Sequence, residues 1–298
     1  MTSDVFSVLI HLQATAPDRS NGAVAPGYQA HAAFLDLLRQ ADPVLSQNLH
    51  DLNQRKPFTL SSLLAGEPDG GTRSNRAKFY QLRLTSLEAG LFETFISRFL
   101  GLDASSLRLR LGEEYFQVSR IVGNGNSSRW VGRSSFEQLS SVSPVRNWSF
   151  EFASPTAFSL GEQDWGGRKF VVFPDPGYVF DSLASCWNDF APSGLLAIDK
   201  AALRQYIEKY VLVSSFKART DLLNFKQHAQ LGFVGTASYR LMEKQPSPQF
   251  SQILSSLAEF ALYTGVGYKT TMGMGQTRLV EERRPTEETR VNKEEVRL

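Results

Sequence analysis

Two histidines and a lysine, His31, His50 and Lys56, lie within a short stretch of the first half of the chain. Histidine gains and loses a proton near neutral pH, so it can act as a general acid or a general base. A lysine ammonium can stabilise the negative charge that builds up on a phosphate during a reaction. Together these residue types suit phosphoryl transfer. The alternative interpretation is two structural histidines and a solvated surface lysine.

A second polar stretch lies near the other end of the chain, at residues 265–275, with the sequence GVGYKTTMGMG. Its four glycines permit positive φ and a close approach of other backbone, and free N–H groups together with Lys269 can hold an anion. An amphipathic helix precedes this glycine loop and a short strand follows it. Nucleotide-phosphate loops have the reverse order, because they place the phosphate at the N-terminus of a helix.

The C-terminal end of a helix repels anions. We therefore expect the glycine loop to hold a polyanion backbone through N–H groups and Lys269, and not a nucleoside triphosphate. The alternative is a connection without a ligand, since glycine is frequent after helices. The predicted contacts in the loop are Gly265, Gly267, Lys269, Gly273 and Gly275.

Periodic patterns in the first half predict the elements that position the two histidines. The expected order is a strand at 3–14, a helix at 28–40, a short helix from 42 to about 50, strands near 57–61 and at 77–85, a helix at 87–100, and strands at 107–111 and 115–122. His31 shares the half-buried face of its helix with Leu35 and Leu38. This order corresponds to the ferredoxin-like βαββαβ plan.

The second half repeats this plan. Strands are expected at 147–152, 210–215, 231–242 and 276–280, and helices at about 179–190 and before the glycine loop. The predicted fold class is α+β, with two tandem ferredoxin-like (RRM-like) domains at 1–143 and 144–280, followed by a charged and flexible tail at 281–298. Further phosphate contacts are expected from Arg108 and Arg110, on one face of a strand, and from Lys217, Arg219 and Lys226, around a hairpin.

Composition narrows the class of protein. The single cysteine, Cys186, excludes an intramolecular disulfide and a cysteine-rich zinc site. Four dispersed histidines indicate no metal site, and we expect no cofactor. The formal net charge of +2 is compatible with a local basic groove. Without a long apolar run or the plan of a signal peptide, we expect a soluble, cytoplasmic protein that does not enter a membrane.

Three segments carry a resemblance to a known family: Leu49-His50-Asp51, the block Lys56-Pro57-Phe58-Thr59-Leu60-Ser61 and the glycine loop. They resemble the repeat-cleaving CRISPR-associated endoribonucleases of the RAMP superfamily, which mature precursor CRISPR RNA. Residues 152–158, 173–176 and 231–235 support this resemblance.

The resemblance implies catalytic roles for His50 and Lys56. The family often has a tyrosine or a second histidine on the preceding helix, and Leu35 stands at the position matched to the tyrosine. His31, one turn earlier on the same face, is the available substitute. The glycine loop would face the catalytic histidine across a cleft between the two halves and hold the RNA backbone. Which histidine is the acid and which the base stays open.

The implied reaction is metal-independent cleavage within the repeats of precursor CRISPR RNA. The 2′-OH attacks the adjacent phosphate and leaves a 2′,3′-cyclic phosphate and a 5′-OH. Implied partners are the repeat RNA and, beyond it, subunits of a CRISPR effector complex, and the protein could be a monomer or a homodimer. One alternative is a non-catalytic RAMP subunit that binds CRISPR RNA in such a complex. Another is an unrelated enzyme whose glycine loop binds a small phosphate ligand.

Overall fold

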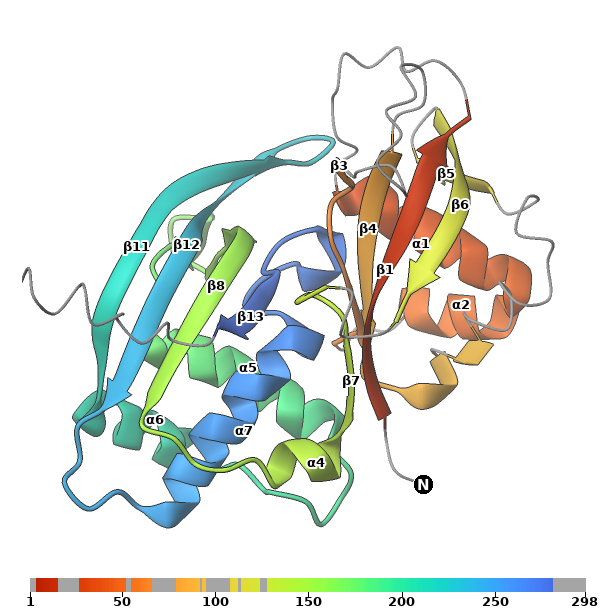
Figure 1. The fold of residues 1–298 in the computed structure, drawn as a ribbon. Helices are drawn as coiled ribbons and strands as arrows, with labels where there is room; N and C mark the ends of the chain where they lie inside the picture. Colours follow the sequence, from red (N-terminus) through yellow and green to blue (C-terminus); the bar gives the residue numbers. More distant parts are fainter. Residues whose placement is uncertain are drawn as a thin grey trace, which may run out of the picture.

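The computed structural model describes residues 4–15, 27–51, 55–65, 79–91, 93–94, 108–111, 114–123 and 128–280. Two antiparallel sheets stand side by side, one from each half of the chain (Figure 1). Helices pack against one face of each sheet. The prediction of an α+β fold with tandem ferredoxin-like domains is confirmed.

The first sheet has β1 at its centre. Its strand order is β2-β4-β1-β6-β5, and β3 and β7 pair with β4 and β1. The strands are β1 (Asp4–Ala14), β2 (Phe58–Leu60), β3 (Leu64–Ala65), β4 (Phe79–Ser86), β5 (Arg108–Leu111), β6 (Glu114–Val122) and β7 (Gly132–Ser135). Leu12, Leu82 and Phe116 on its inner face form a core with the buried side of α1 (Gly27–Ala41). α2 (Pro43–Asp51) follows α1 and packs on it.

The second sheet has the order β11-β12-β8-β13. Its strands are β8 (Asn147–Thr156), β11 (Val211–Asn224), β12 (Ala229–Leu241) and β13 (Thr277–Val280). The other elements of this half are α4 (Phe136–Ser140), β9 (Phe158–Glu162), β10 (Arg168–Val171), α5 (Pro176–Phe190), α6 (Lys200–Tyr210), α7 (Pro248–Thr264) and the short turn η3 (Thr270–Met272). In both sheets the first strand of the plan lies between the third and the fourth, which is the ferredoxin-like order.

Local signals explain the helices that carry the second core. The carboxylate of Asp175 accepts from the N–H of Tyr178 and Pro176 opens α5, while Ser247 caps α7 in the same way. Both helices direct apolar side chains inward onto an aromatic core beneath β8 that includes Trp148 and Phe180. α7 ends at Gly265, so the core fixes where the glycine loop begins.

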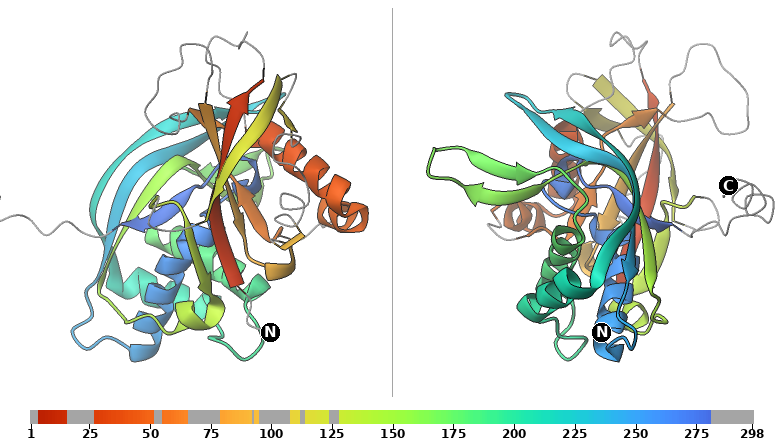
Figure 2. Two further views of the ribbon diagram at one scale, coloured as in Figure 1. Left: turned by 45° about the vertical axis from the view of Figure 1, so that its right-hand side comes forward. Right: turned by 90° about the vertical axis from the view of Figure 1, so that its left-hand side faces the viewer.

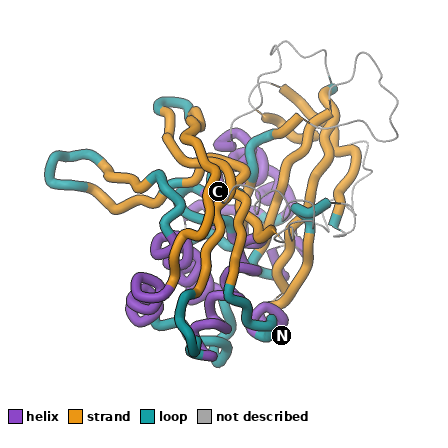
Figure 3. The backbone as a smooth tube through the Cα atoms, turned by 60° about the vertical axis from the view of Figure 1, so that its left-hand side comes forward, coloured by secondary structure: helices purple, strands orange, loops and turns teal. Residues whose placement is uncertain are grey.

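Four features differ from expectation. β7, α6 and the β9–β10 hairpin had no predicted counterpart, and the hairpin projects from the body of the protein (Figures 2 and 3). β11 is longer than expected, so Lys217 and Arg219 lie inside a strand and only Lys226 lies in the turn. Most of β11 is exposed to solvent, so burial imposes no clear alternation on its sequence. The predicted tail, at 281–298, and most of the helix predicted at 87–100 lie outside the described residues, and the domain boundary at 143 stays a prediction.

Candidate active site

The glycine loop has a backbone that side chains would not allow. Gly265, Gly267, Gly273 and Gly275 all have positive φ. A Cβ on Gly267 would lie 2.5 Å from the carbonyl oxygen of Ala157, and one on Gly273 would lie 2.5 Å from Ser62 Oγ. Both the conformation and the close packing therefore require glycine.

The N–H groups of the glycines are already engaged within the protein. Gly265 donates to the Ala261 carbonyl (3.0 Å), Gly267 to Ser182 Oγ (2.8 Å), Gly273 to the Leu60 carbonyl (3.0 Å) and Gly275 to the Pro155 carbonyl (3.1 Å). In the described part of the chain, the N–H groups of residues 269–271 have no such acceptor. The glycines shape the loop, and residues 269–271 present its unoccupied donors.

The loop packs directly onto the first half of the chain. Ser61 and Gly273 form a parallel β-bridge, which extends the hydrogen bond to Leu60. Gly27, the first residue of α1, lies against the carbonyl of Met272 so closely that no Cβ fits there. The expected cleft between the loop and the first half is therefore replaced by direct contact at this point.

His31 is part of that contact. Its side chain is buried, and Nδ1 lies 3.1 Å from the carbonyl oxygen of Thr271. A carbonyl only accepts, so Nδ1 carries a proton and Nε2 is the acceptor nitrogen of the neutral ring. The ring also stacks on Phe58, with centroids 5.7 Å apart. The fold thus brings His31 to the glycine loop, across 240 positions of sequence.

Lys269 is held by the tip of the β11–β12 hairpin. Its Nζ lies 3.1 Å from Nε2 of His228 and 4.0 Å from the ring centroid of Phe225. The Phe225 ring also approaches Tyr28 of α1, with centroids 6.4 Å apart, so the hairpin reaches over the loop to the first half (Figure 1). Burial and, after it, the charge of Arg168 lower the pKa of Lys269.

A cavity of about 630 Å³ opens between the glycine loop, the segment before β2 and helices α5 and α6. Four cations line it, namely Arg55, Lys56, Arg204 and Lys269, together with the other residues of 267–271. Arg55 pairs with Asp189 at 2.9 Å and Arg204 with Glu208 at 3.0 Å. Lys56 and Lys269 come from different halves of the molecule. The cavity contains both hydrogen-bond donors and positively charged side chains, so it is suited to binding a phosphodiester.

Both halves of the chain are similar to known proteins. Residues 150–277 match the family model of the CRISPR-associated endoribonuclease Cas6, and residues 6–141 match the model of the Cas6 N-terminal domain. The chain belongs to the Cas6 family. A Thermus thermophilus Cas6 product complex is 30% identical, with a TM-score of 0.79, over 93% of this chain and 100% of that chain. A second structure of that protein is 27% identical, with a TM-score of 0.70, over 94% of this chain and 100% of that chain.

A curated Cas6 endoribonuclease from Mycobacterium tuberculosis is 27% identical over 140 residues. The match spans 45% of this chain and 39% of the mycobacterial protein. The alignment therefore covers less than half the length of that relative.

His50 of this Cas6 family member is the last but one residue of α2. The helix is fixed against α1 by Ser46, whose hydroxyl donates to the Leu35 carbonyl at 2.9 Å. The side chain of His50 lies outside the described part of the structure. The family resemblance at Leu49-His50-Asp51 is therefore what carries the prediction for this residue.

Five other predicted phosphate contacts do not line the cavity. Arg108 and Arg110 are exposed on the outer face of β5, and Lys217, Arg219 and Lys226 are exposed on β11 and its turn. Arg219 pairs with Asp221 at 2.9 Å. Two cavity residues, Arg55 and Arg204, had not been singled out. Arg55 directly precedes Lys56, which was the available signal, whereas Arg204 lies on the unpredicted helix α6.

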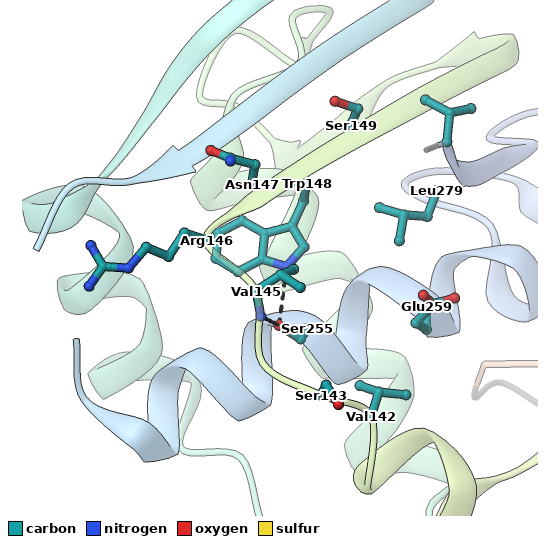
Figure 4. Close-up of a pocket in the computed structure, with 11 residues that line it drawn as sticks. Val142, Ser143, Val145, Arg146, Asn147, Trp148, Ser149, Ser255, Glu259 and Leu279 are labelled. Carbon is teal, nitrogen blue, oxygen red and sulfur yellow. Dashed lines mark hydrogen bonds between the residues drawn. The ribbon is translucent and has the colours of Figure 1, made fainter. Parts of the chain in front are cut away.

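A second hollow in this Cas6 fold, of about 330 Å³, lies at the other end of β8 (Figure 4). The indole N–H of Trp148 and the backbone N–H of Val145 both donate to Ser255 Oγ there, at 3.3 and 3.0 Å. Its lining residues all follow position 141 in the sequence, and they include none of the predicted site residues. The cavity at the glycine loop is the better candidate.

Among the described residues, no group of three histidine, cysteine, aspartate or glutamate side chains is placed to hold a metal ion. No helix in this part of the chain combines the length and the apolar character that crossing a bilayer requires.

Proposed function

We propose that this Cas6 family member is an endoribonuclease that cuts within the repeats of precursor CRISPR RNA. One observation carries the proposal: Lys56 and Lys269 line a single basic cavity, and His31 is hydrogen bonded to the loop that supplies Lys269. A cavity with donors and cations from both halves suits a chain of phosphodiesters better than a small anion.

The proposed reaction uses the ribose of the substrate as its nucleophile. A general base removes the proton of the 2′-OH, the 2′-oxygen forms a bond to the adjacent phosphorus, and the bond from phosphorus to the 5′-oxygen breaks. A general acid protonates the departing 5′-oxygen. The products are a 2′,3′-cyclic phosphate and a 5′-OH. Electron pairs and protons balance within these steps, and side chains supply the base, the acid and the stabilising charge, so the proposed reaction uses no metal ion.

We assign the proton transfers to His50 and His31 and the charge stabilisation to Lys56. A lysine beside the phosphorane offsets the extra negative charge of the transition state. His31 suits the role of base, because its contact with Thr271 leaves Nε2 as the acceptor nitrogen of the neutral ring. The reverse assignment of the two histidines stays open.

The substrate backbone is proposed to run along residues 269–271 of the glycine loop. The N–H groups of these three residues, which bond no acceptor in the described part of the chain, and the ammonium of Lys269 provide donors for one phosphate. The glycines act by shaping this segment. The outer cations Arg108, Arg110, Lys217, Arg219 and Lys226 are proposed to contact RNA beyond the cleavage site. Subunits of a CRISPR effector complex are the proposed recipients of the product.

One observation favours a second candidate, a non-catalytic subunit that holds CRISPR RNA. His31 is buried and bonded to the loop, which is also what a structural histidine would do. This candidate keeps RNA binding and predicts no cleavage.

The test is cleavage of a panel of labelled repeat RNAs in excess EDTA. We expect the wild type to cut one or more of them, and a deoxyribose at the scissile nucleotide to abolish cutting. His50→Ala and Lys56→Ala should each slow cleavage by about 100-fold or more. His11→Ala and Lys244→Ala, at sites that do not line the cavity, serve as matched controls and should cut normally. Tight RNA binding without cutting would support the non-catalytic subunit.

A further inference from the structure

Arg83 joins the two halves of the molecule from inside. It belongs to β4 of the first sheet, and its side chain is only 3% exposed. Nε donates to Ser7 Oγ at 3.0 Å and to the Trp130 carbonyl at 3.1 Å, and Nη1 donates to Oε1 of Gln276 at 2.6 Å. Nη2 donates to the carbonyl of Leu262. A side chain of the first half thus reaches the helix and the strand that flank the glycine loop.

Every partner of this guanidinium in the described structure is neutral. They are carbonyls, a hydroxyl, an amide and the ring of Trp130, whose centroid lies 5.1 Å from Cζ. Burial lowers the pKa of Arg83 to about 9, so the group stays protonated at neutral pH. A buried charge is costly, and apolar side chains of similar size often replace buried charges without loss of stability. The charge therefore calls for an explanation beyond packing.

The position of Leu262 provides one. This residue lies in the last turn of α7, where the carbonyls lack partners within the helix and form its negative pole. The glycine loop begins one residue after the helix ends, so this pole lies at the start of the loop and disfavours an anion near it. The guanidinium of Arg83, which donates to the Leu262 carbonyl, offsets the partial negative charge at this end of the helix.

The same residue also fixes the loop in place. Gln276 directly follows the last glycine of the loop. The backbone N–H of Arg83 donates to Ser61 Oγ at 2.9 Å, and Ser61 forms the β-bridge to Gly273. Arg83 therefore contacts helix α7 before the loop, Gln276 after the loop, and Ser61, which pairs with the loop at Gly273.

We propose that Arg83 is a positioning residue for RNA binding, which holds both ends of the glycine loop on the first half and offsets the negative pole of α7 beneath the RNA backbone. The inference rests on the proposed function for its ligand, a polyanionic RNA. It explains how an anion site can follow a helix C-terminus, where a phosphate is otherwise repelled.

The test separates charge from packing. Arg83→Gln keeps a donor and removes the charge, Arg83→Lys keeps the charge, and Gln276→Glu places a carboxylate beside the guanidinium. The matched controls are Arg278→Gln and Gln249→Glu. Arg278 is also buried beside Trp130, at 5.2 Å, but its ionic partner is Glu151. Gln249 lies at the opposite end of α7.

The probe is the panel RNA that the wild type binds most tightly, with deoxyribose at any scissile nucleotide. Its dissociation constant is measured by fluorescence anisotropy at low and at high salt, and the melting temperature of each variant is recorded. We expect Arg83→Gln and Gln276→Glu to weaken binding by about tenfold at low salt and by less at high salt. Arg83→Lys and both controls should stay within about threefold of the wild type.

Equal losses in Arg83→Gln and Arg83→Lys, or a loss that does not depend on salt, would show a structural role only and overturn the inference. If Arg83→Gln does not fold, Gln276→Glu decides, because it neutralises the same charge and keeps the arginine in place. If Gln276→Glu then binds and cuts RNA at wild-type levels, the role of Arg83 is contradicted, whereas the proposed function is not. A wild type that binds no RNA of the panel would contradict the proposed function as well.

Discussion

Nδ1 of His31 lies 3.1 Å from the carbonyl oxygen of Thr271. This hydrogen bond joins helix α1 of the first half to the glycine loop of the second half. It also sets which nitrogen of the His31 ring carries the proton. His31 could hold the loop in place, transfer a proton, or do both, and these two roles respond differently to substitution. The contact therefore leads to a separable prediction.

His31→Gln should retain RNA affinity and lose cleavage. The glutamine amide can still donate to the Thr271 carbonyl, so the loop stays in place and the dissociation constant should change by less than about threefold. The amide cannot take up a proton near neutral pH, so the single-turnover rate should fall by about 100-fold or more. Cleavage at the wild-type rate would restrict His31 to holding the loop.

Gly273→Ala should disrupt the RNA-binding loop. The backbone there has φ of 94°, and a Cβ would lie 2.5 Å from Ser62 Oγ. The strain should lower the free energy of unfolding by about 1–3 kcal/mol and weaken RNA binding. Gly90→Ala is the matched control, because nothing lies within 4 Å of its Cβ position. Chemical denaturation and anisotropy measure both effects, and an unaffected Gly273→Ala would show that the loop tolerates another backbone.

RNA affinity should decrease as the pH rises, and the decrease should begin at a lower pH than the usual pKa of a lysine would predict. Burial and the charge of Arg168 lower the pKa of Lys269. The protonated form binds phosphate, so a lowered pKa means that the charge is lost earlier as the pH rises. Lys269→Arg should bind RNA with little change over the same range, because arginine stays protonated. A wild type and a Lys269→Arg variant with the same pH profile would exclude Lys269 as the titrating contact.

The hairpin tip should control that titration. The ring centroid of Phe225 lies 4.0 Å from Nζ of Lys269, so we expect the ring to contribute to the burial of the ammonium. Phe225→Ala exposes the ammonium, so the pKa of Lys269 should rise toward its usual value and the alkaline loss of RNA affinity should move to higher pH. Phe216→Ala removes an exposed ring elsewhere on β11 and serves as the control. A titration that does not move in Phe225→Ala would show that the ring is not what buries Lys269.

The amino-acid sequence by itself determined the repeated βαββαβ plan and the nature of the glycine loop. Asp175 with Pro176 predicts where α5 begins, and buried strands alternate clearly, because capping and burial are local constraints that each segment carries in its own residues. Lys56 was named because the block that contains it resembles a motif of the family. β11 was predicted too short, because exposure to solvent relaxes those constraints along most of its length. α6 was missed although Asp199 caps it and Leu203, Tyr206 and Ile207 are buried.

Only the tertiary structure decided which distant groups meet at the candidate site. The contacts of His31 with Thr271, Lys269 with His228 and Arg83 with Leu262 each join segments that lie far apart along the chain. The tertiary structure also decided that the N–H groups of the four glycines donate to acceptors within the protein. In the described part of the chain, the N–H groups of residues 269–271 are the ones in this loop that can bind a ligand. Hydrogen bonds of this kind depend on how two sheets and their helices pack together, and no local periodicity encodes that packing.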